Sequence, residues 1–278
     1  MARKKRLPTN SLTAQITLNQ VGIRSTTGRS RLDNISCTFS AGEIIAIIGP
    51  NGAGKSSLLA ALSGQIPINE GHITLFGHPL NAWTAPQKAQ HLALLTQKHS
   101  LNMPFLVREV LDLSRLYQTG TATQNAAITQ NTLAAFDGSS LYNRYYPELS
   151  GGEQQRVHLA RTFAQLDALG DEAQKPGVLL LDEPTAALDL PHQRHLVTAI
   201  RTAANNGLTV LVSLHDLTLA AQIATRILCL DQGHIKTLGS VDSVIDASCL
   251  AEVFRTPIER IQPKNSKTPV LYIDHNQS

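Results

Sequence analysis

The chain has 278 residues, of which 42% are hydrophobic and 4% aromatic, a composition typical of a globular protein with an aliphatic core. Its net charge of +3 is too small, and its basic residues are too dispersed, to favour nucleic acid as a partner. No apolar run is long enough to cross a bilayer, and no apolar segment follows the basic N-terminus as in a signal peptide. These features predict a soluble, intracellular protein.

The basic cluster Arg3–Arg6 lies within residues 1–13, which we expect to form a flexible, solvated N-terminus. Contact of this cluster with a membrane surface or with nucleic acid is the alternative. The three cysteines are far apart and predict neither a disulfide framework nor a zinc site. Cys37 and Cys229 lie in apolar stretches and are expected to be small core residues.

The N-terminal part of the chain predicts several strands. Ala14–Leu18 and Ile35–Phe39 alternate apolar and polar side chains, as half-buried strands do. The turn-rich stretch Ser25–Ser30 lies between them and predicts a loop. Ile44–Ile48 is continuously apolar, which indicates a strand buried on both faces. Ile73–Phe76 is a further strand, closed by a glycine.

The stretch Gly49–Ser57 fits the phosphate-binding pattern G-x-x-x-x-G-K-[ST] and lies between the buried strand and a predicted helix at Leu58–Leu62. Glycines let the backbone approach phosphate closely, and N–H groups at a helix N-terminus favour an anion. Lys55 would reach the β- and γ-phosphates, and the Ser56 hydroxyl would hold Mg²⁺. A glycine-rich turn without a ligand is the alternative, which the flanking strand and helix disfavour. The predicted phosphate-binding residues are Gly49, Pro50, Asn51, Gly52, Ala53, Gly54, Lys55, Ser56 and Ser57.

Polar side chains also end three other apolar stretches. Val178–Asp182 ends in a carboxylate and is followed by Glu183. Leu208–Leu214 is followed by His215, and Leu92–Gln97 ends in a glutamine. Because ligands bind at the carboxyl ends of parallel strands, we expect these side chains to gather at one edge of a sheet beside the phosphate-binding loop.

This set of residues suits phosphoryl transfer, which needs mainly positioning and charge neutralisation. Asp182 would support Mg²⁺, often through water, together with Ser56 and the amide oxygen of Gln97. Glu183 would orient or deprotonate the attacking water, and His215 would be the second catalytic residue. A solvated strand end and a structural histidine are the alternatives, and the shared position at strand ends disfavours both.

Residues 98–148 differ in character from the α/β stretches and predict a helical insertion. Apolar residues recur at helical spacing over residues 107–116, and the stretch Thr119–Asn131 is polar. Leu133–Leu141 resumes a weaker helical pattern.

The C-terminal half begins with Ser150 and Glu153, whose capping-box spacing predicts the start of a helix. Asp167–Gly177 is polar and predicts a loop. Arg226–Lys236 predicts a hairpin, and Val241–Phe254 carries short helical patterns. The polar last dozen residues are consistent with a loosely held strand or a tail.

These elements together resemble the nucleotide-binding subunits of ABC transporters over about residues 14–255. The resemblance implies an α/β P-loop NTPase core with an N-terminal antiparallel β subdomain and a helical subdomain at about residues 98–163. The nucleotide-binding domain would span residues 14–262 and be followed by a tail, residues 263–278. The motifs that carry the resemblance are the Walker A loop at 49–57, the Q-loop Gln97, the signature Leu149–Gln154, the Walker B strand 178–182, Glu183, the D-loop Ala187–Asp189 and the switch histidine His215.

The resemblance also implies an assembly. In the family, the signature residues Ser150, Gly151 and Gly152 and the D-loop residue Asp189 would contact ATP held by a partner subunit. Because the chain has one motif set, a head-to-tail homodimer with two ATP molecules is expected. Mg²⁺ would accompany the ATP.

One feature departs from the family pattern. Family members usually stack adenine on an aromatic residue about 23 positions before the first Walker A glycine, whereas residues 24–28 here read Arg-Ser-Thr-Thr-Gly. The sequence therefore indicates no adenine-stacking residue.

The cargo is inferred from resemblance alone. His215–Ala221 resembles an element of importers for iron-siderophores, haem and cobalamin, and the stretches 165–176 and Leu188–Gln193 are similar to haemin-import ATPases. We therefore expect an ATPase peripheral to the cytoplasmic face of the bacterial inner membrane, working with two copies of a separate permease and a periplasmic binding protein. Siderophore or cobalamin import is the first alternative. A soluble ABC ATPase of translation or DNA repair is the second, although such proteins usually carry two of these domains or a long coiled coil.

The permease would contact the groove beside Gln97. The expected contact residues are Leu101, Met103, Pro104, Phe105 and Leu106. A core-facing connector to the helical insertion is the alternative for this stretch.

Overall fold

The computed structural model describes residues 14–24, 28, 30–97, 101, 103–170, 176–245, 247–261 and 269–273. The predicted flexible N-terminus, residues 1–13, and most of the predicted loop Ser25–Ser30 lie outside these ranges, as do residues 171–175 of the predicted loop Asp167–Gly177.

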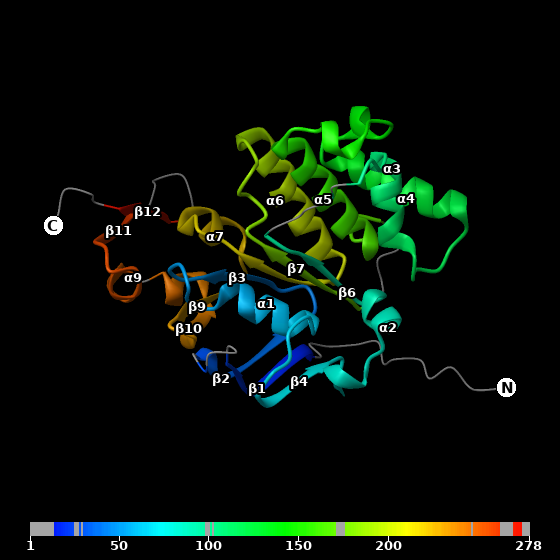
Figure 1. The fold of residues 1–278 in the computed structure, drawn as a ribbon. Helices are drawn as coiled ribbons and strands as arrows, with labels where there is room; N and C mark the ends of the chain where they lie inside the picture. The colour runs from blue at the N-terminus through cyan, green and yellow to red at the C-terminus, as the bar shows by residue number, and fades with distance from the viewer. Residues whose placement is uncertain are drawn as a thin grey trace.

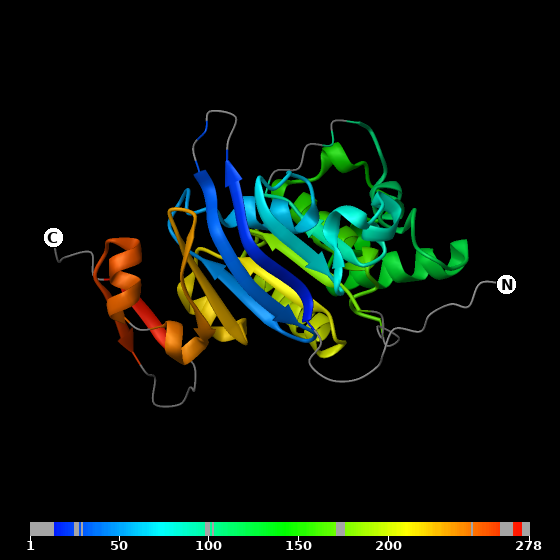
Figure 2. The ribbon, with the colours of Figure 1, turned by 90° about the horizontal axis from the view of Figure 1, so that it is seen from below.

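An antiparallel sheet with the strand order β2-β1-β4-β5 forms one layer of the molecule. Its strands are β1 (Ala14–Arg24), β2 (Ser30–Ser40), β4 (Glu70–Leu75) and β5 (His78–Pro79). The first two strands run further than their alternation predicted, because irregularities in the pairing let Val21 and Ile23 also reach the core. In Figure 2 these strands, in blue, lie across the central sheet.

The central sheet has the order β10-β9-β3-β8-β7-β6, and its strands are parallel except for β10 at the edge. Its strands are β3 (Ile44–Ile48), β6 (Leu92–Leu95), β7 (Val178–Asp182), β8 (Thr209–Ser213), β9 (Arg226–Asp231) and β10 (His234–Ser240). Strand β6 ends at Leu95, so Gln97 lies two residues beyond the strand that it was predicted to end.

Both faces of the central sheet are covered, which explains the continuous apolar runs of its strands. In β3, Ile45 and Ile47 pack into a core shared with α1 (Lys55–Ser63) and the antiparallel sheet, whereas Ala46 and Ile48 pack into a second core. Helices α5 (Gly151–Gln165), α6 (Leu190–Asn205) and α7 (Leu217–Ile223) close the second core. Figure 1 shows α1 and α6 on opposite sides of the sheet.

A helical subdomain is built from α3 (Val107–Asp112), α4 (Ala122–Ala135) and the signature helix α5. Rings of Phe136 and Phe163 pack edge to face at 5.2 Å and join the ends of α4 and α5. Most of the polar stretch Thr119–Asn131 lies in helix α4, which starts with a capping box between Thr121 and Gln124. The subdomain, in green, lies at one end of the molecule (Figure 1).

The C-terminal segment lies at the other end (Figure 2). It comprises α8 (Val241–Val244), α9 (Ala247–Phe254) and a two-stranded sheet of β11 (Ile258–Ile261) and β12 (Val270–Ile273). The remaining short elements are α2 (Ala85–Ala89) and the 3-10 turns Leu80–Ala82, Leu113–Arg115, Ser139–Leu141 and Tyr146–Glu148. No helix in the described ranges combines the length and the hydropathy needed to cross a bilayer.

Burial of two cysteine thiols generates a chemical prediction. Burial raises the pKa of Cys37 to about 12, against the opposing effect of Arg226, and raises that of Cys229 to about 12. Because the thiolate is the reactive form, a disulfide reagent at pH 8 should label at most one of the three cysteines rapidly in the folded chain. All three should react after unfolding in guanidinium, and rapid native labelling of two or three would contradict this packing.

Candidate active site

The predicted phosphate-binding loop is a tight connection between β3 and α1, in which glycine is required at two positions. Gly49 has φ 148°, and a Cβ there would lie 2.1 Å from the carbonyl oxygen of Leu230. Gly54 has φ 109°, and a Cβ there would lie 2.8 Å from the carbonyl oxygen of Arg31. The loop is therefore packed against β9 and β2, which fixes its backbone N–H groups around the start of α1.

Lys55 is buried at the first position of α1, with 6% of its surface exposed. Its Nζ donates to the carbonyl oxygens of Gly49 at 2.8 Å and Pro50 at 3.2 Å. Burial lowers the pKa of Lys55, while the carboxylates of Glu183 and Asp182 act against that shift. The ammonium group thus lies between the loop and the two carboxylates, where it would neutralise terminal phosphates.

The central strands bring the predicted site residues to one edge of the sheet. Ile47 of β3 pairs with Ser213 of β8, which pairs with Asp182 of β7. The Ser213 hydroxyl donates to Asp182 Oδ1 at 2.7 Å and accepts the N–H of Glu183 at 2.8 Å. A single buried hydroxyl therefore fixes both carboxylate residues.

Glu183 has a left-handed backbone, φ 48°, which is unusual for a residue with a side chain and is typical of functional sites. Its Oε2 accepts the amide of Gln97 at 2.6 Å, and its Oε1 lies 2.5 Å from Nε2 of His215. The structure therefore joins the three predicted strand-end residues through one carboxylate. This geometry places Glu183 at the centre of the site, with 14% of its side chain exposed.

The residues present fit Mg²⁺. The described residues contain no cluster of three or more His, Cys, Asp or Glu side chains that could hold a metal. Mg²⁺ does not need such a cluster, because it binds through one or two carboxylates together with phosphate oxygens and water. Asp182 is 6% exposed and lies beside the phosphate loop, and Ser56 lies at the start of α1, so these two residues would hold the ion.

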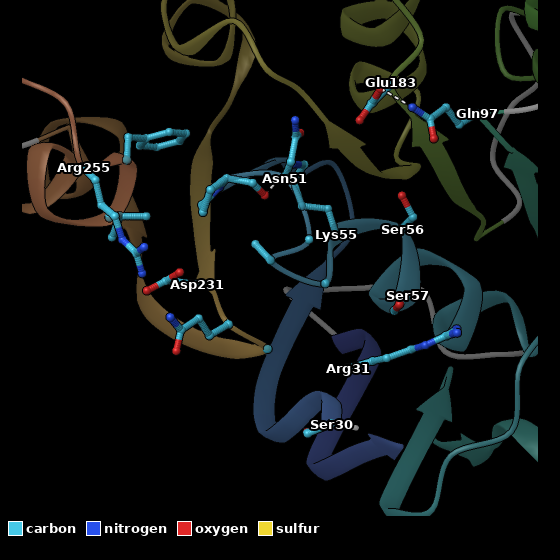
Figure 3. A pocket seen from close by; sticks show the side chains of 18 residues that line it. Ser30, Arg31, Asn51, Lys55, Ser56, Ser57, Gln97, Glu183, Asp231 and Arg255 are labelled. Atoms are coloured by element: carbon cyan, nitrogen blue, oxygen red, sulfur yellow. Dashed lines mark hydrogen bonds between the residues drawn. The ribbon is translucent and has the colours of Figure 1, made fainter. Parts of the chain in front are cut away.

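An open pocket of about 1060 Å³ runs from Gln97 and Glu183 along the phosphate loop. Figure 3 shows Glu183 and Gln97 at one end of this pocket, with Arg31 and Arg255 at other sides. The sequence did not single out the walls beyond the loop, because they come from segments without a nucleotide motif. These walls are formed by Ser30, Arg31, Asp231, Gln232, Gly233, Val253, Phe254 and Arg255.

The signature residues do not line this pocket. Ser150 caps α5, and Glu153 Oε2 accepts the Ser150 N–H at 2.8 Å and its hydroxyl at 2.9 Å, which completes the predicted capping box. These bonds, the backbone bond first, lower the pKa of Glu153. Gly151 is exposed, and a Cβ at this position would meet no atom within 4 Å, so the helix start can be approached from outside.

Asp189 likewise lies away from the pocket, at the N-cap of α6. Its carboxylate accepts the backbone N–H of His192 at 3.1 Å, which lowers the pKa of Asp189, and it also contacts the His192 ring. Within one chain, the structure therefore does not bring Ser150, Gly151, Gly152 or Asp189 to the phosphate loop.

Comparison with known proteins decides the family. The family model described as ABC transporter matches residues 32–186, more than half of the chain. The chain belongs to the ABC transporter family. The hemin import ATP-binding protein HmuV of Photobacterium profundum is 42% identical over 88% of this chain and 86% of its own length. HmuV of Escherichia coli O157:H7 is 38% identical over 91% of this chain and 97% of its own length.

Solved ABC transporter structures share the fold. A putative metal-chelate type ABC transporter in an inward-facing conformation has a TM-score of 0.77 at 22% identity, covering 95% of this chain and 98% of that one. The dimeric bacterial cassette MJ0796 has a TM-score of 0.72 at 22% identity, covering 81% and 98%. The predicted fold class is confirmed, and the chain is an ATP-binding, ATP-hydrolysing subunit of this family.

Ser213 generates a prediction because it links both carboxylate residues. Ser213→Ala leaves the Asp182 carboxylate and the Glu183 N–H without this buried partner, which should destabilise the fold by about 1–3 kcal/mol. It should also lower kcat about 10- to 100-fold by displacing Glu183. Urea unfolding and ATPase assays measure both effects. The control is Ser63→Ala, whose hydroxyl donates to the Ala60 carbonyl and accepts the Gln65 N–H at the end of α1, away from both carboxylates. Equal losses of stability and of kcat in the Ser213→Ala and Ser63→Ala variants would contradict the role of Ser213.

Proposed function

We propose that this chain powers haem import through a separate permease at the cytoplasmic face of a bacterial inner membrane. The observation that carries the proposal is the likeness to proteins named for hemin import, at 42% identity over most of both chains. The arrangement within one chain supports it, because both carboxylates, Gln97 and His215 lie beside the phosphate loop at one edge of the sheet.

The residues suggest how the site works. Loop amides and Lys55 would hold the phosphates, and Mg²⁺, held by Ser56 and Asp182, would neutralise part of the phosphate charge. Glu183 would accept a proton from the attacking water while Gln97 and His215 hold its carboxylate in place. Because His215 is half-exposed and contacts Glu183, it would also respond to the presence of the terminal phosphate.

A head-to-tail homodimer would complete the site. The start of α5 is exposed and lies away from the chain's own phosphate loop, although its hydroxyl and amides suit an anion. In a dimer these groups would cover the ATP of the partner subunit, and ATP would favour the closed state because it contacts both chains. The D-loop residue Asp189, exposed at the N-cap of α6, would lie at the same interface.

The permease would dock on the connector before α3. Met103 is 60% exposed, whereas Leu101 and Phe105 are partly buried against the core of the helical subdomain. Tyr145, which is 49% exposed, lies across a β-bridge from Leu106 and extends the apolar surface. A solvent-exposed apolar surface beside Gln97 suits a partner whose movement is coupled to the active site.

The dimer predicts the behaviour of a trapped variant. Glu183→Gln keeps the shape of the side chain but replaces one acceptor oxygen by an amide donor and removes the base, so it should bind ATP, fail to hydrolyse it and accumulate as a dimer. Light scattering after gel filtration with ATP measures this. Glu259→Gln on the exposed edge of β11 is the matched control and should hydrolyse ATP normally. A Glu183→Gln chain that stays monomeric with ATP would refute the shared site.

The cargo is tested by ATPase activity in lipid with the permease and its binding protein. Haem-loaded binding protein should stimulate the activity, and ferric siderophore or cobalamin should not. Met103→Asp should abolish stimulation and leave the basal activity of the isolated subunit intact. The control is Ile261→Asp, which is also exposed but lies at the far end of the molecule, and it should leave both the stimulation and the basal activity unchanged. Stimulation by a siderophore or cobalamin instead would reassign the cargo.

A further inference from the structure

Arg31 lies at an irregularity in the pairing of β1 with β2. Ile23 pairs with Leu32, but Arg24 pairs with Ser30, so Arg31 is an extra residue on β2. Such β-bulges redirect a side chain and occur often beside active sites. Leu32 enters the core, with 1% of its surface exposed, whereas Arg31 is exposed and lines the nucleotide pocket.

The backbone at Arg31 is held against the phosphate loop. A Cβ on Gly54 would lie 2.8 Å from the Arg31 carbonyl oxygen, and a Cβ on Gly233 would lie 2.9 Å from the same atom. The Gly233 N–H donates to the carbonyl of Ala53 at 3.0 Å, and the Asp33 N–H donates to the carbonyl of Gly233 at 2.9 Å. The position of Arg31 relative to the loop is therefore fixed by packing from two sides.

The Arg31 side chain lies at the end of the pocket away from the catalytic carboxylate. Figure 3 shows it passing alongside Ser57, while Ser56 lies on the side of Gln97 and Glu183. Successive residues of a helix project about 100° apart, which separates the two serines in this way. If the terminal phosphate faces Glu183, Arg31 lies where the nucleoside end of ATP would extend.

We propose that Arg31 binds the adenine of ATP by stacking its planar guanidinium on the base. The guanidinium is delocalised and weakly hydrated, and it stacks on aromatic faces. It would replace an aromatic platform, which residues 24–28 do not supply. Among the described residues lining the pocket, the aromatic side chain is Phe254, and it is already packed against the core. This inference rests on the proposed function only in that the ATP of the transport cycle binds at this same site.

Binding of ATP and of inorganic tripolyphosphate to the whole chain, measured by calorimetry, tests the proposal. Arg31→Ala should weaken ATP binding about ten-fold and leave tripolyphosphate binding unchanged, because the latter has no base. Arg31→Tyr should restore ATP affinity, and Arg31→Lys, which keeps the charge but not the plane, should not. Arg24→Ala is the control, since that arginine pairs with Glu70 at 2.9 Å outside the pocket. Thermal melting confirms that each variant is folded.

Three results would overturn the proposal. Arg31→Ala could bind ATP as tightly as the wild type does. Arg31→Ala could weaken tripolyphosphate binding as much as ATP binding, with Arg31→Lys restoring ATP affinity. That result would make Arg31 a phosphate contact. Phe254→Ala could lower ATP affinity selectively, which would place the base on that ring. A wild-type chain that binds no ATP would instead refute the proposed function, so the two failures are distinguishable.

Discussion

The parallel register of β3, β8 and β7 is the constraint on which the site depends. It brings the phosphate loop, Ser213 and Asp182 to the same edge of the sheet, although more than a hundred residues separate the first from the last. The Ser213 hydroxyl then converts that register into a fixed geometry for Asp182 and for the backbone of Glu183. A change in pairing by one residue would turn these side chains to the other face of the sheet.

The same edge explains how ATP can control the assembly. Glu183 has a left-handed backbone and bonds both to Gln97, next to the proposed permease contact, and to His215, next to the C-terminal segment. In the proposed assembly, a change at the terminal phosphate would therefore reach two surfaces through one side chain. The exposed start of α5 belongs neither to the surface next to Gln97 nor to the one next to the C-terminal segment. This helix start is therefore available to a second chain.

Much of this arrangement could be predicted from the sequence, because short-range signals fix it. The phosphate loop, Asp182 at the end of β7 and the capping box at Ser150 depend on local pattern, and each lies where expected. Gln97 lies two residues beyond the end of β6, because an apolar run marks a strand more closely than it marks the strand's last residue. Helix α4 was less evident because few of its residues are buried, and a cap at Thr121 rather than an apolar stripe marks its start. The bulge at Arg31 and the bridge through Ser213 depend on pairing between distant strands, which no local pattern reveals.

The central claim is that one chain's phosphate loop works with another chain's signature. ATPase activity of mixed variants tests it most directly. Lys55→Ala chains lack a working loop and Ser150→Arg chains lack a working signature, so neither homodimer has an intact site. A mixed dimer has one intact site, made from the loop of the second variant and the signature of the first. We predict that mixing restores activity above the sum of the two variants, and a mixture that remains at that sum would contradict the account.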